Sequence, residues 1–154
     1  MTKHSVTQGT FTLERTFPNC TPARAFSAFS TPEGKQRWFS GPPEEWKELE
    51  RAFDFRVGGH ERAVGRFKSG MVSAFDCRYY DIIDNERIIY AYEMHLNDNK
   101  ISVSLATLTF EAAGTSCRLT LHEDGAFLDG YDDSGSRQRG TEALLNALAA
   151  ALAR

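Results

Sequence analysis

The sequence predicts one α+β domain in which a curved antiparallel sheet of about seven strands surrounds a long C-terminal helix, in the order strand, two helices, six strands, helix. Short segments alternate apolar with polar residues, turn-forming residues separate them, and leucines recur at helical spacing near the C-terminus. The 154 residues suit a single hydrophobic core. We therefore expect one domain over residues 9–154, preceded by a flexible N-terminal extension at residues 1–8.

The N-terminal part combines one strand with two short helices. Gly9–Phe17 has the alternation of a strand. In Thr21–Pro22 and again in Thr31–Pro32, threonine suits the N-cap of a helix and proline suits its first position. The second helix is expected to end before Gly41–Pro43, because glycine followed by two prolines does not continue a helix.

Six strands are predicted next. In the first of them Phe53, Phe55 and Val57 occupy alternate positions, and Gly58–Gly59 then turns the chain. The later connectors are short and rich in Gly, Asn and Asp, so they should join neighbouring strands as antiparallel hairpins. The strands after this turn are predicted at His60–Phe67, Met71–Tyr80, Arg87–His95, Ile101–Phe110 and Ser116–Glu123.

The C-terminal part is predicted as a loop and a long helix. Asp124–Ser136 is rich in Gly and Asp, which favours a loop. In the helix, at about Ser136–Ala153, Leu144, Leu148 and Leu152 form an apolar stripe. One sheet cannot bury its apolar face alone, and a twisted sheet that curls around one helix leaves space between the two. We therefore expect a cavity between the sheet and this helix.

The composition argues against several classes of protein. The formal net charge is −3, with 18 Lys and Arg against 21 Asp and Glu, and no basic stripe marks a nucleic-acid binder. Residues 1–9 lack the apolar segment of a signal peptide, and no apolar run is long enough to span a bilayer. Cys20, Cys77 and Cys117 form no CxxC pair and are expected to be reduced thiols. We expect a cytoplasmic protein with no nucleic-acid or membrane partner.

The histidines do not form a recognisable catalytic or metal site. His60, His95 and His122 lie on predicted strands but lack the spacing of zinc ligands. Glu93 shares a face with His95, and this face should point to solvent because the opposite one is more apolar. The opposite face, which we expect to be concave, carries Ile88, Tyr90, Tyr92 and Met94.

The acidic residues after the last strand raise the question of a calcium site. Asp129–Asp132 does not have the spacing of an EF-hand loop. Asp132 and Asp133 are instead expected to lie near the positive end of the following helix. We therefore expect no metal, no cofactor and no catalytic residue, and favour binding over catalysis.

A series of short motifs runs along the chain. The most specific is Asp54–Gly59, which has an Asp-x-Arg-x-Gly-Gly pattern at the end of a strand. The supporting motifs are Thr31–Glu33 with Trp38 downstream, Tyr80–Ile83 followed by Glu86–Ile88, Gly114–Thr115 before a strand, and Leu119–His122 running into Gly125–Phe127. In their order and spacing, from Phe11 to Leu152, these motifs resemble the family of activator of heat-shock-protein-90 ATPase homologues, part of the START/polyketide-cyclase (SRPBCC) superfamily.

This resemblance implies the helix-grip fold, in which a sheet surrounds the last helix. It also implies a chaperone as a partner and a role in the stress response. Two features depart from the family's pattern. Gly140–Thr141 stands where family members often have Gly-Trp, which would enlarge or reshape the mouth of a cavity. The eukaryotic co-chaperone also has an additional N-terminal domain, which we do not expect in this chain.

The expected function is binding of a small hydrophobic or aromatic molecule between the sheet and the C-terminal helix, with the loop of Phe127 at the mouth. The alternatives are a co-chaperone-like or stress-response interaction module and, third, a cyclase- or hydrolase-type enzyme that uses the same cavity. A solid core without a cavity also stays open, as does the choice between monomer and homodimer. The residues predicted to form the cavity wall are Trp38, Phe55, Tyr90, Tyr92, Phe127, Leu144, Leu145 and Leu148.

Overall fold

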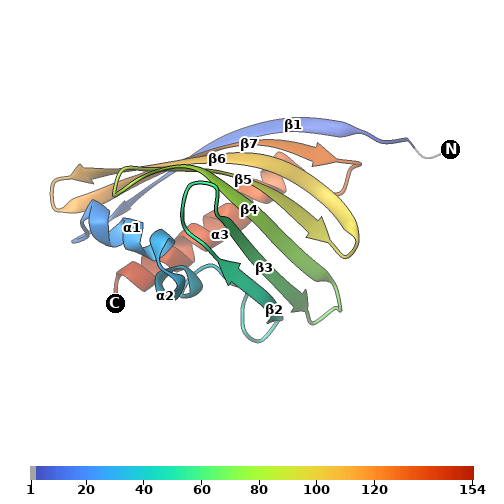
Figure 1. Ribbon diagram of the computed structural model, residues 1–154, viewed down its shortest axis with the longest axis horizontal. Helices are drawn as coiled ribbons and strands as arrows, with labels where there is room; N and C mark the ends of the chain where they lie inside the picture. The colour runs from blue at the N-terminus through green and yellow to red at the C-terminus, as the bar shows by residue number, and fades with distance from the viewer. Residues whose placement is uncertain (1–2) are drawn as a thin grey trace.

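The computed structural model describes residues 3–154 and confirms the predicted α+β class and element order (Figure 1). The first two residues of the predicted N-terminal extension lie outside the described range. The elements are β1 (Val6–Phe17), α1 (Pro22–Ser30), α2 (Pro32–Gln36), β2 (Trp46–Phe53), β3 (His60–Phe67), β4 (Val72–Ile83), β5 (Arg87–Leu96), β6 (Asn99–Ala113), β7 (Ser116–Leu128) and α3 (Ser134–Leu152).

The strands of residues 3–154 form one antiparallel sheet in the order β1-β7-β6-β5-β4-β3-β2. Six of them follow one another as the predicted meander from β2 to β7. The first strand closes the sheet on the far side, because β1 pairs with β7 over its whole length, from Val6 opposite Leu128 to Phe17 opposite Cys117. The two edges of the sheet are therefore β1 and β2.

Several strand boundaries differ from the prediction, and those of β1, β2 and β7 have a clear physical reason or move a predicted residue out of a strand. β1 begins at Val6 because residues 6–8 pair with residues 126–128 of β7. β7 continues to Leu128, so the first five residues of the predicted loop, residues 124–128, belong to the strand. Buried and more exposed residues continue to alternate after Glu123, with Gly125 and Phe127 buried. The prediction was wrong here because it relied on the preference of glycine and aspartate for loops. β2 ends at Phe53, so Phe55 and Val57 follow the strand instead of belonging to it.

The helices begin where the capping residues predict. Thr21 Oγ1 accepts a hydrogen bond from Arg24 N, and Thr31 Oγ1 accepts one from Gly34 N, each at the start of a helix with proline at its first position. Asp133 caps α3 by accepting from Ser136 N at 2.8 Å. That contact lowers the pKa of Asp133 and agrees with the expected place of this carboxylate at the positive end of the helix.

α3 lies along the concave side of the sheet (Figure 1). Its buried residues are Leu145, Leu148 and Leu152, while Leu144 of the predicted stripe is only half-buried. α1 covers one end of the same space, with Phe26 and Phe29 packed edge-on against Phe110 of β6 at 5.4 Å each. No helix among residues 3–154 has both the length and the apolar character needed to cross a membrane.

Replacing Leu148 with alanine should lower the free energy of unfolding by about 2–5 kcal/mol, because a fully buried leucine leaves a sealed hole between helix and sheet. Leu144→Ala, one turn away on a half-buried position, should cost less. Urea unfolding of both variants makes the comparison. Equal losses would mean that α3 does not pack on the sheet through the face described.

Candidate functional site

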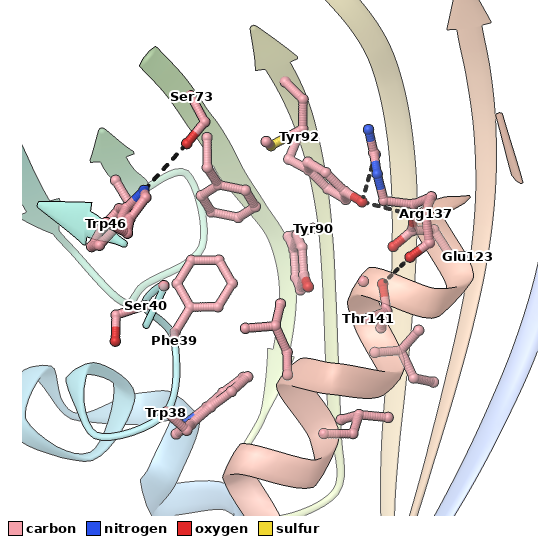
Figure 2. Close-up of a pocket in the computed structure, with 18 of the residues that line it drawn as sticks. Trp38, Phe39, Ser40, Trp46, Ser73, Tyr90, Tyr92, Glu123, Arg137 and Thr141 are labelled. Atoms are coloured by element: carbon pink, nitrogen blue, oxygen red, sulfur yellow. Dashed lines mark hydrogen bonds between the residues drawn. The ribbon is translucent and has the colours of Figure 1, made fainter. Parts of the chain in front are cut away.

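A cavity of about 360 Å³ lies between the sheet and α3 (Figure 2). Its floor comes from β3, β4, β5 and β7, and its other walls come from α3, the end of α1 and the segment between α2 and β2. Ser40, Phe67 and Gly140 line the cavity and are also exposed, so they mark its opening. The mouth therefore lies between the α2–β2 segment and the first turns of α3, not at the loop of Phe127, where the sequence placed it.

Aromatic rings form one continuous wall of the cavity. Phe39 packs edge-on against Phe75 with ring centroids 4.9 Å apart, and Phe75 lies 5.1 Å from Tyr92. Alternation along β5 places Tyr90, Tyr92 and Met94 on this concave face, as the sequence predicts. Edge-on packing of this kind fixes ring positions, so the wall is preformed.

Trp46 extends the wall onto the edge strand β2. Its indole lies directly over Gly65 of β3, and its Nε1 donates a hydrogen bond to Ser73 Oγ at 3.5 Å (Figure 2). A Cβ at position 65 would overlap the indole ring. Gly65 therefore lets this ring lie flat against the sheet beside the mouth.

Polar side chains meet at the α3 end of the cavity (Figure 2). Tyr92 Oη donates to Glu123 Oε2 at 2.7 Å and accepts from Arg137 Nη1 at 3.0 Å. Arg137 Nη2 donates to Ser102 Oγ at 2.8 Å and to Asp132 Oδ2 at 2.9 Å. We call Tyr92, Glu123 and Arg137 the polar corner of the cavity.

The surroundings of the polar corner set its protonation. Burial raises the pKa of Glu123, while the Tyr92 hydrogen bond and the charge of Arg137 partly offset that effect. Burial also raises the pKa of Tyr92 and of Tyr90, so both phenols keep their protons at neutral pH. The Arg137 guanidinium lies 5.6 Å from the Tyr92 ring and 5.4 Å from the Phe127 ring, which adds cation–π attraction.

A second buried polar cluster lies behind the aromatic wall. Lys35 Nζ of α2 donates to Glu61 Oε1 of β3 at 3.0 Å, and Tyr79 Oη donates to the same oxygen. The ammonium also lies 4.4 Å from the centre of the Phe39 ring. This ion pair ties α2 to the sheet and so fixes the ring of Phe39 at the cavity. Nearby, burial raises the pKa of the Cys77 thiol to about 12.

Five of the eight residues predicted for the wall line this cavity, and three do not. Phe55 packs 4.9 Å from Tyr79 and 5.8 Å from Phe26, because the chain turns toward α1 after β2 ends. Phe127 lies beside Arg137, and Leu148 fills the core beyond the cavity. The predicted residues that line it are Trp38, Tyr90, Tyr92, Leu144 and Leu145.

Glu123 and Arg137 were not among the predicted site residues, although the sequence pattern around each of them indicates an interior position. Alternation places Glu123 on the same face of β7 as Leu119 and Leu121, so a carboxylate continues an apolar face. Arg137 precedes Leu145 by two steps of four, with Thr141 between them, so it extends the apolar stripe of α3. A charged residue that continues the apolar face of a strand or helix is therefore a candidate for a polar group inside the protein.

The other charged candidates lie away from the cavity. Glu93 pairs with Lys100, and His122 shares a hydrogen bond of 2.8 Å with Thr12 Oγ1 on the outer face of the sheet. The three cysteines are buried free thiols that form no disulfide with one another. Within residues 3–154, no three His, Cys, Asp or Glu side chains gather in a way that could hold a metal ion.

Comparisons with known proteins agree with the motifs. The family model described as Activator of Hsp90 ATPase homolog 1-like protein matches residues 19–153. A solved structure from Rhizobium leguminosarum is 42% identical, covers 99% of each chain and has a TM-score of 0.93. The Mll3558 protein from Rhizobium loti is 39% identical over 95% of this chain and 98% of its own, with a TM-score of 0.86. A search of curated proteins found no match.

A more distant neighbour has the same architecture. The CV1439 protein from Chromobacterium violaceum is 28% identical over 93% of this chain and 96% of its own, with a TM-score of 0.74. These matches confirm the resemblance that the motifs indicate and the helix-grip fold that it implies.

Glu123→Gln should become more stable relative to the wild type as the pH rises. Burial raises the folded-state pKa of Glu123, so the stability due to its protonated form is complete below the unfolded pKa of about 4.3. That stability is lost as the pH rises through the folded pKa, and glutamine does not lose it. Urea unfolding between about pH 4 and pH 8 measures the difference.

The control for this series is Glu93→Gln, which removes a carboxylate from the outer face of the sheet. It should show no such relative gain. A wild type that gains stability over Glu123→Gln across the same pH range would contradict the assignment of Glu123 to a desolvated site.

Lys35→Met should lower the free energy of unfolding by about 3–5 kcal/mol, because it leaves Glu61 as a buried charge without its partner. The double variant Lys35→Met/Glu61→Gln should recover most of that loss, since neither charge is then present. Urea unfolding compares the two. A double variant as unstable as the single one would show that packing, not the charge pair, accounts for the loss.

Proposed function

This chain belongs to the family of Activator of Hsp90 ATPase homolog 1-like proteins, and from that premise we propose that its cavity binds a small apolar or aromatic molecule. The observation that carries the proposal is the preformed cavity between the sheet and α3. Its volume of about 360 Å³ falls at the lower end of the range for small-molecule sites, about 300–1,000 Å³. Sites of this kind combine apolar walls with a few polar groups that orient the ligand.

The residues around the cavity support this proposal. Phe39, Phe75 and Tyr90 present large ring surfaces whose burial by a ligand is favourable. The polar corner places the charged lining residues together at the α3 end of the cavity, which suits a ligand with one polar end. The expected ligand-binding residues are those of the predicted wall that line the cavity: Trp38, Tyr90, Tyr92, Leu144 and Leu145.

A ligand present at about 100 times its Kd should raise the melting temperature by about 5–10 °C, since it adds about 2.7 kcal/mol to the stability of a domain of this size. A thermal-shift panel of lipids, aromatic molecules and polyketides measures this. Thr141→Trp should abolish the response, because the indole would occupy space beside the mouth. A flat response across the whole panel would remove the proposal.

Thr141→Val is the matched control for this experiment. It keeps the shape of the side chain, gives up only the hydrogen bond from Thr141 Oγ1 to the Arg137 carbonyl, and should retain the response. Ligand binding that survives Thr141→Trp unchanged would place the ligand outside the cavity.

The family description supports a second candidate function, the binding of a chaperone of the Hsp90 class. This interaction would use the surface of the domain, so cavity variants such as Thr141→Trp should leave it intact. A pull-down with the purified chaperone, followed by its ATPase rate, tests the candidate. No association at micromolar concentrations would count against it.

Catalysis inside the cavity is a third candidate, favoured by the carboxylate of Glu123 beside open space. A carboxylate acts as a general base only within hydrogen-bond reach of its substrate, and Glu123 lines the cavity in which a substrate would have to bind. Incubating a molecule that co-purifies with the wild type with fresh protein, followed by mass spectrometry, distinguishes catalysis from binding. A product that forms with the wild type and not with Glu123→Gln would indicate turnover, and an unchanged mass with both would favour binding alone.

A further inference from the structure

We propose that the ligand of this cavity carries a hydrogen-bond donor, a hydroxyl or an amine, that binds Glu123, and that carboxylates and other anions are excluded. This inference rests on the proposed binding function and adds the chemical class of the ligand. It follows from which hydrogen-bonding groups of the polar corner are already used by the protein and which are left for a ligand.

Arg137 would be the natural partner of an anionic ligand, but its hydrogen bonds are directed into the protein. Nη1 donates to Tyr92 Oη, and Nη2 donates to Ser102 Oγ and Asp132 Oδ2. Only about a tenth of the Arg137 side chain is exposed. The guanidinium therefore acts as a fixed part of the wall and offers no open fork to a carboxylate.

Glu123 provides the acceptor that the protein leaves free. Its Oε2 accepts from Tyr92 Oη, whereas its Oε1 makes no hydrogen bond with any described residue. Glu123 lines the cavity and is otherwise buried, with 4% of its surface exposed. Oε1 is not fully buried, so it is accessible from the cavity. A ligand that covers this oxygen must bring a donor to it, because a carboxylate oxygen that loses its contact with water and gains no donor is unfavourable.

Tyr92 strengthens this preference. Its single proton already goes to Glu123, and Arg137 donates to its oxygen, so Tyr92 has no proton for a ligand. Tyr90, the neighbouring phenol on the same face of β5, makes no hydrogen bond with residues 3–154 and can donate to or accept from the ligand's polar end. The polar end of the cavity thus combines an unused acceptor with one adaptable hydroxyl.

The local charges point the same way. Two carboxylates, Asp132 and Glu123, already surround the one guanidinium of Arg137. An anionic ligand would place a third negative charge beside them in a desolvated site, where like charges repel strongly. A neutral hydroxyl or an amine meets no such repulsion, and the ring faces of Phe75 and Tyr90 also attract positively polarised groups.

Three probes of similar size test the inference by calorimetry on the full chain at about pH 7.5. They are 2-naphthol, which has a donor, 2-methoxynaphthalene, which lacks it, and 2-naphthoate, which is an anion. We expect 2-naphthol to bind at least about tenfold more tightly than its methyl ether, the ratio typical of a hydrogen bond to a charged group. We expect 2-naphthoate to bind most weakly.

Glu123→Gln should reduce the preference for 2-naphthol over its methyl ether to less than about threefold, while Glu93→Gln should leave it unchanged. Similar affinities of the wild type for all three probes would overturn the ligand class and leave the cavity-binding function standing. Tightest binding of 2-naphthoate would overturn it in favour of Arg137 as an anion site. If none of the three probes binds, the result would count against both the ligand class and the cavity-binding function.

Discussion

The packing of α3 against the concave face of the sheet is the constraint on which the rest of this structure depends. An antiparallel sheet with an apolar inner face needs an apolar partner, and Leu145, Leu148 and Leu152 supply it from the second half of the helix. In the first half the same face of the helix carries Arg137 and Thr141 instead. One helix thus closes the core along part of its length and leaves a lined cavity along the rest.

The two buried polar clusters divide along this boundary. Lys35 and Glu61 pair inside the packed region, where they hold α2 and its aromatic neighbours against the sheet. The polar corner borders the cavity, where Oε1 of Glu123 has no hydrogen-bond partner in the described protein and can bind a ligand. Both clusters carry a desolvation penalty that apolar residues would avoid. In the polar corner the proposed ligand contact would offset part of that penalty, whereas nothing in the structure explains the unpartnered Oε2 of Glu61.

Local patterns were enough to predict the fold, because capping residues, turns and alternation act over a few residues. Thr21 and Thr31 cap the helices as expected, and alternation along β5 places Tyr90 and Tyr92 inside. The site was only partly predictable, since it depends on contacts between distant segments. The apolar pattern alone included Leu148, which is solid core, and passed over Glu123, whose place beside Tyr92 follows from the pairing of separate strands.

The methionine methyl groups offer the most direct test that a molecule enters between sheet and helix. Met94 lines the cavity, whereas Met71 is exposed in the turn just before β4 and serves as an internal control. In a spectrum of protein labelled with ¹³C at the methionine methyls, an aromatic ligand such as 2-naphthol should shift the Met94 resonance and leave Met71 in place. A Met94 resonance that stays unchanged at saturating ligand would contradict the account.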